Sequence, residues 1–237
     1  MISKKLQFVA DPSKGKVSAI LEVPDSADAL LVLGHGAGAG MHHANLENIA
    51  AALQRQRIAT FRYQFPFRER GGGRDSKQVS LATVKNACDR AAQLAPNLPL
   101  FAGGHSFGGR MTSLAAAEGL LPPLQGLVFF AFPLHPPGKA SVERAQHLSE
   151  IKQPMLFLSG TRDKLFTIEL FRPILTKLKR NSGKRNSGKR SSSANRPRAS
   201  LHLLDTADHG YKTLKRTRQS EESVFDEMAR VTRSWIG

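Results

Sequence analysis

Short apolar runs alternate with helix-like stretches along most of the chain, and this order constrains the fold more than any other feature. A nearly unbroken apolar run predicts a strand that is buried on both faces. Strands that alternate with helices favour a mostly parallel sheet with helices on both faces, so the predicted fold class is α/β. The expected strands lie at 29–34, 57–62, 98–103, 127–131, 155–158 and 201–204.

The two ends of the chain fit the same plan. Two earlier apolar runs, 6–9 and 17–21, can pair as an antiparallel edge of the sheet. The last helix should present its apolar side chains on one side. At 237 residues and 40% hydrophobic composition, the chain suits one domain over 1–237. Only about 20 residues separate the strand at 127–131 from the next, so no large lid domain fits there.

The net charge of +16 would suggest a nucleic-acid partner if it were spread over the surface. Residues 177–199, however, hold nine Lys or Arg and no acid, which leaves +7 for the rest. The repeated Arg-Asn-Ser-Gly-Lys and a serine run predict a disordered basic insertion at 179–199, on the side opposite the carboxyl ends of the strands. It has no aromatic residue to stack on bases, so we expect no specific nucleic-acid recognition.

Several classes of protein are disfavoured by what the sequence lacks. No run approaches the roughly 18 apolar residues of a membrane span, and the first residues do not resemble a secretory signal. We therefore expect a cytoplasmic protein. Cys88 is the single cysteine, and its alanine-rich helical setting predicts a small buried apolar side chain. The sequence does not indicate an oligomeric state.

The segment 104–108, Gly-His-Ser-Phe-Gly, directly follows one expected strand and opens a helix. In this context the Gly-x-Ser-x-Gly pattern predicts a sharp turn that exposes Ser106 as a nucleophile. Gly104, Gly108 and Gly109 would provide the clearance that the turn needs. The helix N-terminus would stabilise negative charge beside the serine. The alternative is a glycine-rich turn with an ordinary serine.

A serine nucleophile requires a histidine base that an acid orients. Among eight histidines, His209 alone follows the last expected strand, although a plain surface histidine is the alternative. Asp163 follows the strand at 155–158 and completes the order Ser, Asp, His. Asp205 and Asp208 are nearby alternatives, but Asp208 adjoins the histidine and is less able to orient its ring. We therefore favour Asp163.

The glycine-rich loop at 34–40 follows the strand at 29–34 and predicts an oxyanion hole. We assign its two backbone N–H groups to Ala37 and Phe107, the residue after the serine. The alternative is a tight turn whose glycines serve geometry alone. The loop lacks the Gly-x-Gly-x-x-Gly spacing of a dinucleotide site, and adjacent His42 and His43 lack spaced partners for a metal. We therefore expect neither a cofactor nor a metal.

Together these motifs resemble the dienelactone-hydrolase-like branch of the α/β-hydrolases. More narrowly, they are similar to bacterial relatives of testis-expressed protein 30 and of the hydrolase-like domain in a regulatory subunit of a nuclear histone-acetylation complex, the NSL complex. The resemblance implies an α/β-hydrolase fold over almost all of the chain. Dienelactone hydrolase uses a cysteine nucleophile, whereas this chain has Ser106, so that substrate is not implied. The motifs are 35–38, 61–67, 103–110, 132–138 and 160–163.

The sequence thus predicts a serine hydrolase that cleaves an ester or related small acyl substrate through a Ser106, Asp163 and His209 triad and an acyl-enzyme. An acyltransferase with the same triad is one alternative. A non-catalytic binding or regulatory module is another, because the nuclear relatives indicate that this fold can serve interactions. Phenylalanines at such positions are more often plain core residues, but the candidates for an apolar wall are Phe65, Phe67, Phe107 and Phe132.

Overall fold

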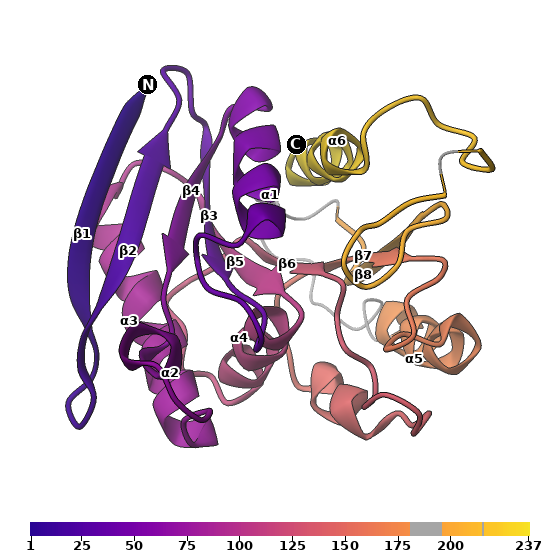
Figure 1. Cartoon of the computed structure of the whole chain (residues 1–237), viewed down its shortest axis with the longest axis horizontal. Coiled ribbons are helices and arrows are strands. Elements are labelled where there is room, and N and C mark those ends of the chain that lie inside the picture. Colours follow the sequence, from indigo (N-terminus) through magenta and orange to yellow (C-terminus); the bar gives the residue numbers. More distant parts are fainter. Residues whose placement is uncertain (181–195, 215) are drawn as a thin grey trace.

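The computed structural model describes residues 1–180, 196–214 and 216–237. Its centre is an eight-stranded sheet in the order β1-β2-β4-β3-β5-β6-β7-β8 (Figure 1). All neighbours from β4 to β8 are parallel, whereas β2 is antiparallel to both β1 and β4. The strands are β1 Ile2–Asp11, β2 Gly15–Val23, β3 Ala29–Gly34, β4 Ile58–Tyr63, β5 Leu100–His105, β6 Gly126–Phe130, β7 Met155–Gly160 and β8 Ala199–Leu204.

The predicted strands are confirmed, and their burial explains why they are so apolar. Every residue of β3, β4, β6 and β7 is buried, as expected for central strands covered on both faces. The antiparallel edge is confirmed as well, with Leu6 of β1 opposite Ala19 of β2 and Phe8 opposite Val17.

The helices form a layer on each face of the sheet (Figure 1). Apolar residues of α1 and α6 pack in one core cluster, and those of α3, α4 and α5 pack in the other. The buried side of α6 includes Val224 and Met228, as the sequence predicts. The helices are α1 Ala44–Arg55, α2 Pro66–Arg70, α3 Lys77–Leu94, α4 Phe107–Ala117, α5 Ile168–Arg180 and α6 Val224–Ile236.

The connection between β6 and β7 is short and holds one 3-10 helix, η1, at Glu143–Ser149. The described residues contain no lid domain, in agreement with the expected architecture. None of the described helices has the length and apolar character that crossing a bilayer requires.

The predicted disordered insertion at 179–199 overlaps two described elements at its ends. Helix α5 extends to Arg180, and β8 begins at Ala199. Arg196 donates to the backbone carbonyls of Gln125 and Ile236, and its guanidinium lies over the Phe101 and Trp235 rings. Residues 181–195, which hold the rest of the prediction, lie outside the described residues.

Candidate active site

Ser106 lies at the sharp turn between β5 and α4. Its backbone has φ 51° and ψ −111°, a conformation that a non-glycine residue adopts only when its surroundings enforce it. Two hydrogen bonds hold the turn: the Ser106 N–H donates to the Phe130 carbonyl at 2.9 Å, and the Gly108 N–H donates to the His35 carbonyl at 3.0 Å. The chain is thus pinned to the ends of the neighbouring strands on both sides of the serine.

The glycines around the serine are required by close backbone contact. A Cβ on Gly104 would lie 2.3 Å from the Gly34 carbonyl oxygen, and one on Gly108 would lie 2.3 Å from the Gly34 carbonyl carbon. A Cβ on Gly109 would lie 2.7 Å from the Gly104 carbonyl oxygen. The turn therefore packs directly against the end of β3, as the glycine pattern predicts.

The structure brings Ser106, Asp163 and His209 together, although they are far apart in the sequence. His209 Nε2 lies 2.9 Å from Ser106 Oγ. Its other ring nitrogen, Nδ1, lies 2.9 Å and 3.0 Å from the two carboxylate oxygens of Asp163. A carboxylate only accepts, so Nδ1 carries the proton and Nε2 accepts from the serine hydroxyl.

The carboxylate that contacts His209 is that of Asp163, not that of its neighbours in the sequence. Asp163 follows β7, its side chain is fully buried, and its Oδ1 also accepts the Leu165 N–H at 2.8 Å. Asp208 instead accepts the backbone N–H groups of Gly210 and Lys212 and so stabilises the histidine loop. Asp205 accepts the N–H of Gln219.

The glycine-rich loop is held by His35, which is fully buried. Its Nε2 accepts the Phe65 N–H at 3.0 Å, so its Nδ1 must donate to the Gly36 carbonyl at 2.8 Å. Burial lowers the pKa of His35 to about 4, which keeps the ring neutral and this pattern intact at neutral pH. The Gly36 peptide that precedes Ala37 is therefore fixed in orientation.

The N–H groups of Ala37 and Phe107 take part in none of the turn and loop hydrogen bonds of the described residues. Phe107 is the first residue of α4, where helix geometry leaves the N–H without an internal partner. A Cβ on Gly36 would lie 3.8 Å from the Ser106 Cβ, so the loop closely approaches the serine. Both N–H groups therefore lack a backbone partner in this part of the described chain, and the loop that carries one of them lies close to Ser106.

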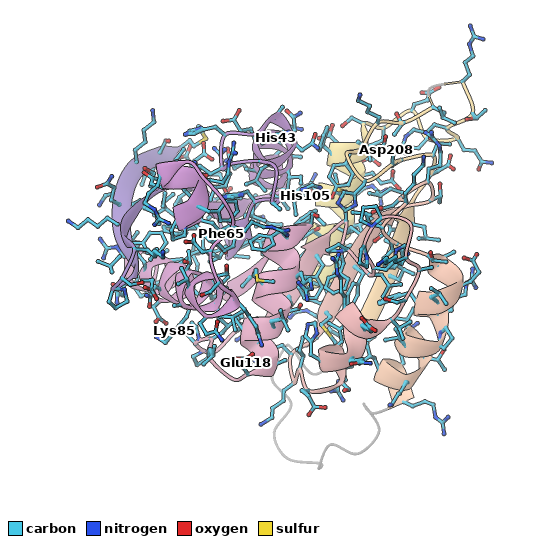
Figure 2. All side chains as sticks on the ribbon, turned by 60° about the horizontal axis from the view of Figure 1, so that its bottom comes forward. His43, Phe65, Lys85, His105, Glu118 and Asp208 are labelled. Atoms are coloured by element: carbon cyan, nitrogen blue, oxygen red, sulfur yellow. The ribbon has the colours of Figure 1, made fainter. Side chains whose placement is uncertain are left out.

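His105, which is labelled in Figure 2, is partly buried and makes a second contact to the histidine loop that the sequence does not reveal. Its Nε2 lies 3.2 Å from the His209 carbonyl, to which it donates, and its ring lies 5.5 Å from the His209 ring. Burial lowers the pKa of His105 to about 4, and repulsion from His209 adds to this shift. The only local signal was its place beside Ser106, which says nothing of a contact 104 residues away.

Of the four phenylalanines considered for an apolar wall, three are core residues. Phe65, Phe67 and Phe132 are buried, and Phe107 alone is partly exposed. The Phe107 ring packs edge-on against Phe65 and Phe67, at centroid distances of 5.1 Å and 5.7 Å. Any apolar contact at the site from this set is therefore made by Phe107.

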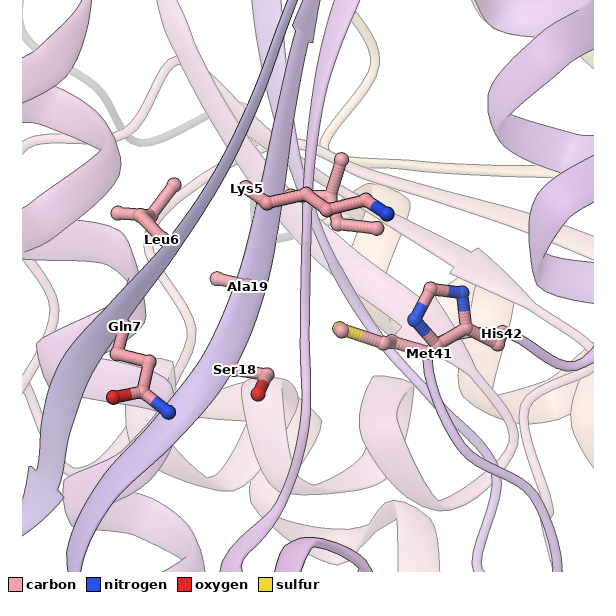
Figure 3. Close-up of a pocket in the computed structure, with 8 residues that line it drawn as sticks. Lys5, Leu6, Gln7, Ser18, Ala19, Met41 and His42 are labelled. Carbon is pink, nitrogen blue, oxygen red and sulfur yellow. The ribbon is translucent and has the colours of Figure 1, made fainter.

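In the described part of the chain, no three His, Cys, Asp or Glu side chains gather as metal ligands would. Cys88 is buried and unpaired, as predicted, and burial raises the pKa of its thiol. A cavity of about 450 Å³ lies at the edge formed by β1 and β2, and Lys5 and His42 are among the residues that line it (Figure 3). Ser106, Asp163 and His209 do not line this cavity.

A mostly parallel sheet with an exposed serine at a strand-to-helix turn and no lid defines the α/β-hydrolase class. The chain belongs to the family described as "Alpha/beta hydrolase domain", which its sequence matches over residues 27–237. This match covers every element from β3 to α6.

Solved structures share the fold at low sequence identity. Dienelactone hydrolase from Anabaena variabilis has a TM-score of 0.67 and 16% identity, with 98% of this chain and 96% of that chain covered. A serine hydrolase without lid from Xanthomonas campestris has a TM-score of 0.65 and 18% identity, with 97% and 94% covered. Est1E from Butyrivibrio proteoclasticus, with ferulic acid bound, has a TM-score of 0.67 and 16% identity, with 93% and 96% covered.

No curated protein sequence matches the chain significantly. The dienelactone-hydrolase-like resemblance is supported at the level of the fold. The narrower resemblance to testis-expressed protein 30 and to the NSL subunit finds no support in these comparisons and stays a prediction.

Proposed function

We propose that this protein is a serine hydrolase that cleaves a carboxylic ester or a related small acyl substrate. The observation that carries the proposal is the continuous hydrogen-bond chain from Ser106 Oγ through the His209 ring to the buried Asp163 carboxylate. Each contact has the length and partner that an activated serine requires. Ser106 would be the nucleophile, His209 the general base and Asp163 the group that orients it.

The first half of the reaction forms an acyl-enzyme. Ser106 Oγ attacks the carbonyl carbon while its proton moves to His209 Nε2, and Asp163 stabilises the imidazolium that results. The carbonyl oxygen becomes negatively charged and accepts hydrogen bonds from the N–H groups of Ala37 and Phe107. His209 then returns the proton to the leaving oxygen, and the alcohol departs.

The second half uses water in place of the serine hydroxyl. His209 takes a proton from water, which attacks the acyl carbon, and then gives that proton to Ser106 Oγ as the acid is released. The chain supplies every proton-transfer group that this cycle needs. An acyltransferase would differ only in replacing water by another acceptor.

The ester class is supported by the relatives in the fold as well as by the site. Est1E and an esterase domain from Rhodothermus marinus share the fold with this chain at 16% and 17% identity. No member of the proposed triad is missing, which favours catalysis over a non-catalytic binding module. Because the connection after β6 carries only η1, small substrates should reach Ser106 without a lid opening.

The test is hydrolysis of p-nitrophenyl esters of increasing acyl length by the wild type and by Ser106→Ala. We expect the variant to lose on the order of 10⁴-fold or more in turnover, because the nucleophile is gone. Its circular dichroism and urea unfolding should match the wild type. A correctly folded Ser106→Ala with activity within about tenfold of wild type would remove Ser106 from the mechanism.

A further inference from the structure

Three arginines near the proposed active site lack a carboxylate partner. Arg74 lies in the loop before α3, Arg110 on α4 and Arg144 in η1. Among the described residues, none of these guanidinium groups forms an ion pair or a hydrogen bond. Residues 181–195 and Lys215, which lie outside the described residues, include no Asp or Glu and so add no carboxylate partner.

Two nearby carboxylates, Asp75 and Glu118, are already paired with other cations, whereas Glu143 adjoins Arg144 in the sequence and forms no ion pair among the described residues. Asp75 lies 2.9 Å from Arg70 and 3.6 Å from Lys14. Glu118 lies 2.7 Å from Lys77. Neither carboxylate pairs with one of the three arginines, although the Asp75 Oδ2 is buried without a hydrogen-bond partner.

The arginines are close enough to repel one another. Burial lowers the pKa of Arg110, and repulsion from Arg144 and Arg74 lowers it further. Burial and Arg74 act on Arg144 in the same direction. The Arg110 Nε is buried without a hydrogen-bond partner, which is costly for a charged donor. An anion bound between these groups would remove both costs.

Two arginines of the cluster line a cavity that reaches Phe107, the residue after Ser106. The cavity has a volume of about 200 Å³, and its charged lining residues are Arg74, Arg110, Lys77 and one acid, Asp75, so the positive charges outnumber the negative one. Arg110 is one helical turn after the serine, and its N–H donates to the Ser106 carbonyl. Side chains on a helix tilt toward its N-terminus, so the Arg110 side chain leans toward the serine.

We infer that this cavity binds an anionic oxygen group of the substrate, a carboxylate or a phosphate, so that the enzyme selects esters with a negative charge on the acyl chain. Guanidinium groups bind the oxygens of either anion in a bidentate way. One helical turn spans about 5 Å, so the charge should lie a few carbon atoms from the scissile carbonyl. This inference rests on the proposed hydrolase function and specifies its substrate class.

The test compares esters of equal length that differ in charge. The mono-p-nitrophenyl ester of glutaric acid carries a terminal carboxylate, p-nitrophenyl 4-phosphonobutanoate carries a phosphonate, and p-nitrophenyl valerate is neutral. For the wild type, kcat/KM for one of the charged esters should exceed that for valerate by about tenfold or more. This ratio corresponds to one or two charge-assisted hydrogen bonds between the cluster and the substrate. The charged ester that is hydrolysed faster shows whether the cavity prefers a carboxylate or a phosphate-like group.

Variants assign the preference to the cluster. Arg110→Gln and Arg74→Gln should each lower the ratio of charged to neutral kcat/KM about tenfold or more. Arg90→Gln is the matched control, because Arg90 lies on α3 outside the cavity and bonds Gln93 instead. If Arg110→Gln does not fold, Arg74→Gln tests the same prediction, because Arg74 is exposed and its replacement should not affect folding.

A binding measurement separates this inference from the proposed function. Ser106→Ala should bind the glutarate or the phosphonate ester in calorimetry, and adding Arg110→Gln or Arg74→Gln should weaken that binding about tenfold or more. If the wild type hydrolyses valerate at least as well as both charged esters, the anion site is wrong and the hydrolase stands. If the wild type hydrolyses none of the three, the hydrolase proposal fails, and calorimetry still decides for or against the anion site.

Discussion

At the scale of single residues, His209 owes its geometry to a buried carboxylate and a partly buried imidazole. Asp163 accepts its Nδ1–H, and His105 donates to its backbone carbonyl. The Asp163 carboxylate is in turn held by the Leu165 N–H. The ring therefore presents Nε2 to Ser106 with little freedom to rotate away.

The two aspartates near His209 should differ sharply in their effect on catalysis. Asp163→Asn presents an amide that can donate to Nδ1, which favours the wrong tautomer, and turnover should fall on the order of 10⁴-fold. Asp208→Asn keeps an oxygen that accepts the loop N–H groups, so turnover should stay within about tenfold. Ester hydrolysis by both variants measures the difference, and a larger loss in Asp208→Asn would mean that the acid is misassigned.

His35 should make stability depend on pH in acid. Its pKa is about 4 in the fold against an ordinary value of 6.5. Between these values the unfolded chain binds a proton that the folded one does not, so the free energy of unfolding falls as pH falls, and the full shift corresponds to a loss on the order of 3 kcal/mol. Above pH 6.5 both states are neutral and the effect vanishes.

The matched variant His35→Gln isolates this contribution. It should lose less stability than the wild type between pH 7 and pH 4, whatever its stability at pH 7. Urea unfolding at several pH values gives the slope of unfolding free energy against pH for the wild type and for the variant. Equal slopes would show that His35 titrates normally in the folded protein.

At the scale of elements, the turn from β5 to α4 depends on its contact with the end of β3. Gly34 is the residue that both Gly104 and Gly108 approach, so three glycines from two strands and a helix share one small volume. This packing holds Ser106 at positive φ and leaves its hydroxyl exposed to His209.

Gly108→Ala should damage this element specifically. Its Cβ would meet the Gly34 backbone at 2.3 Å, so we expect a loss of about 1–3 kcal/mol in unfolding free energy, or more, together with a large loss of turnover. Gly73→Ala is the control, because nothing lies within 4 Å of its Cβ position, and it should stay within about 0.5 kcal/mol of wild type. Similar unfolding curves for the two variants would contradict the packing argument.

The sequence predicts the long elements well and the short ones poorly. Central strands such as β3 and β7 are apolar throughout because both faces are covered, which makes their pattern readable. Helix α2 and η1 are too short for a helical period to be recognised, and both were missed.

Contacts between distant segments leave even less trace in the sequence. The His105 contact with the His209 loop and the meeting of Arg74, Arg110 and Arg144 depend on segments that only the fold brings together. The wall residues illustrate the same limit, because nothing in the local pattern distinguishes Phe107 from the buried Phe65.

At the scale of the whole molecule, the sheet topology explains the site. Ser106, Asp163 and His209 follow β5, β7 and β8, which are parallel and end at the same edge of the sheet. Ligand sites of open α/β sheets form in the crevice outside the carboxyl ends of the strands. The strand order alone therefore allowed the three residues to be chosen, whereas their distances required the structure.

The most direct test of the central claim is intact-protein mass spectrometry after treatment with a fluorophosphonate, followed by peptide mapping. An activated serine attacks the phosphorus and displaces fluoride, so we expect one adduct, on Ser106, in the wild type and none in Ser106→Ala. His209→Gln should slow labelling strongly, because the base is lost. A wild type that stays unmodified, or an adduct that persists in Ser106→Ala, would contradict the account.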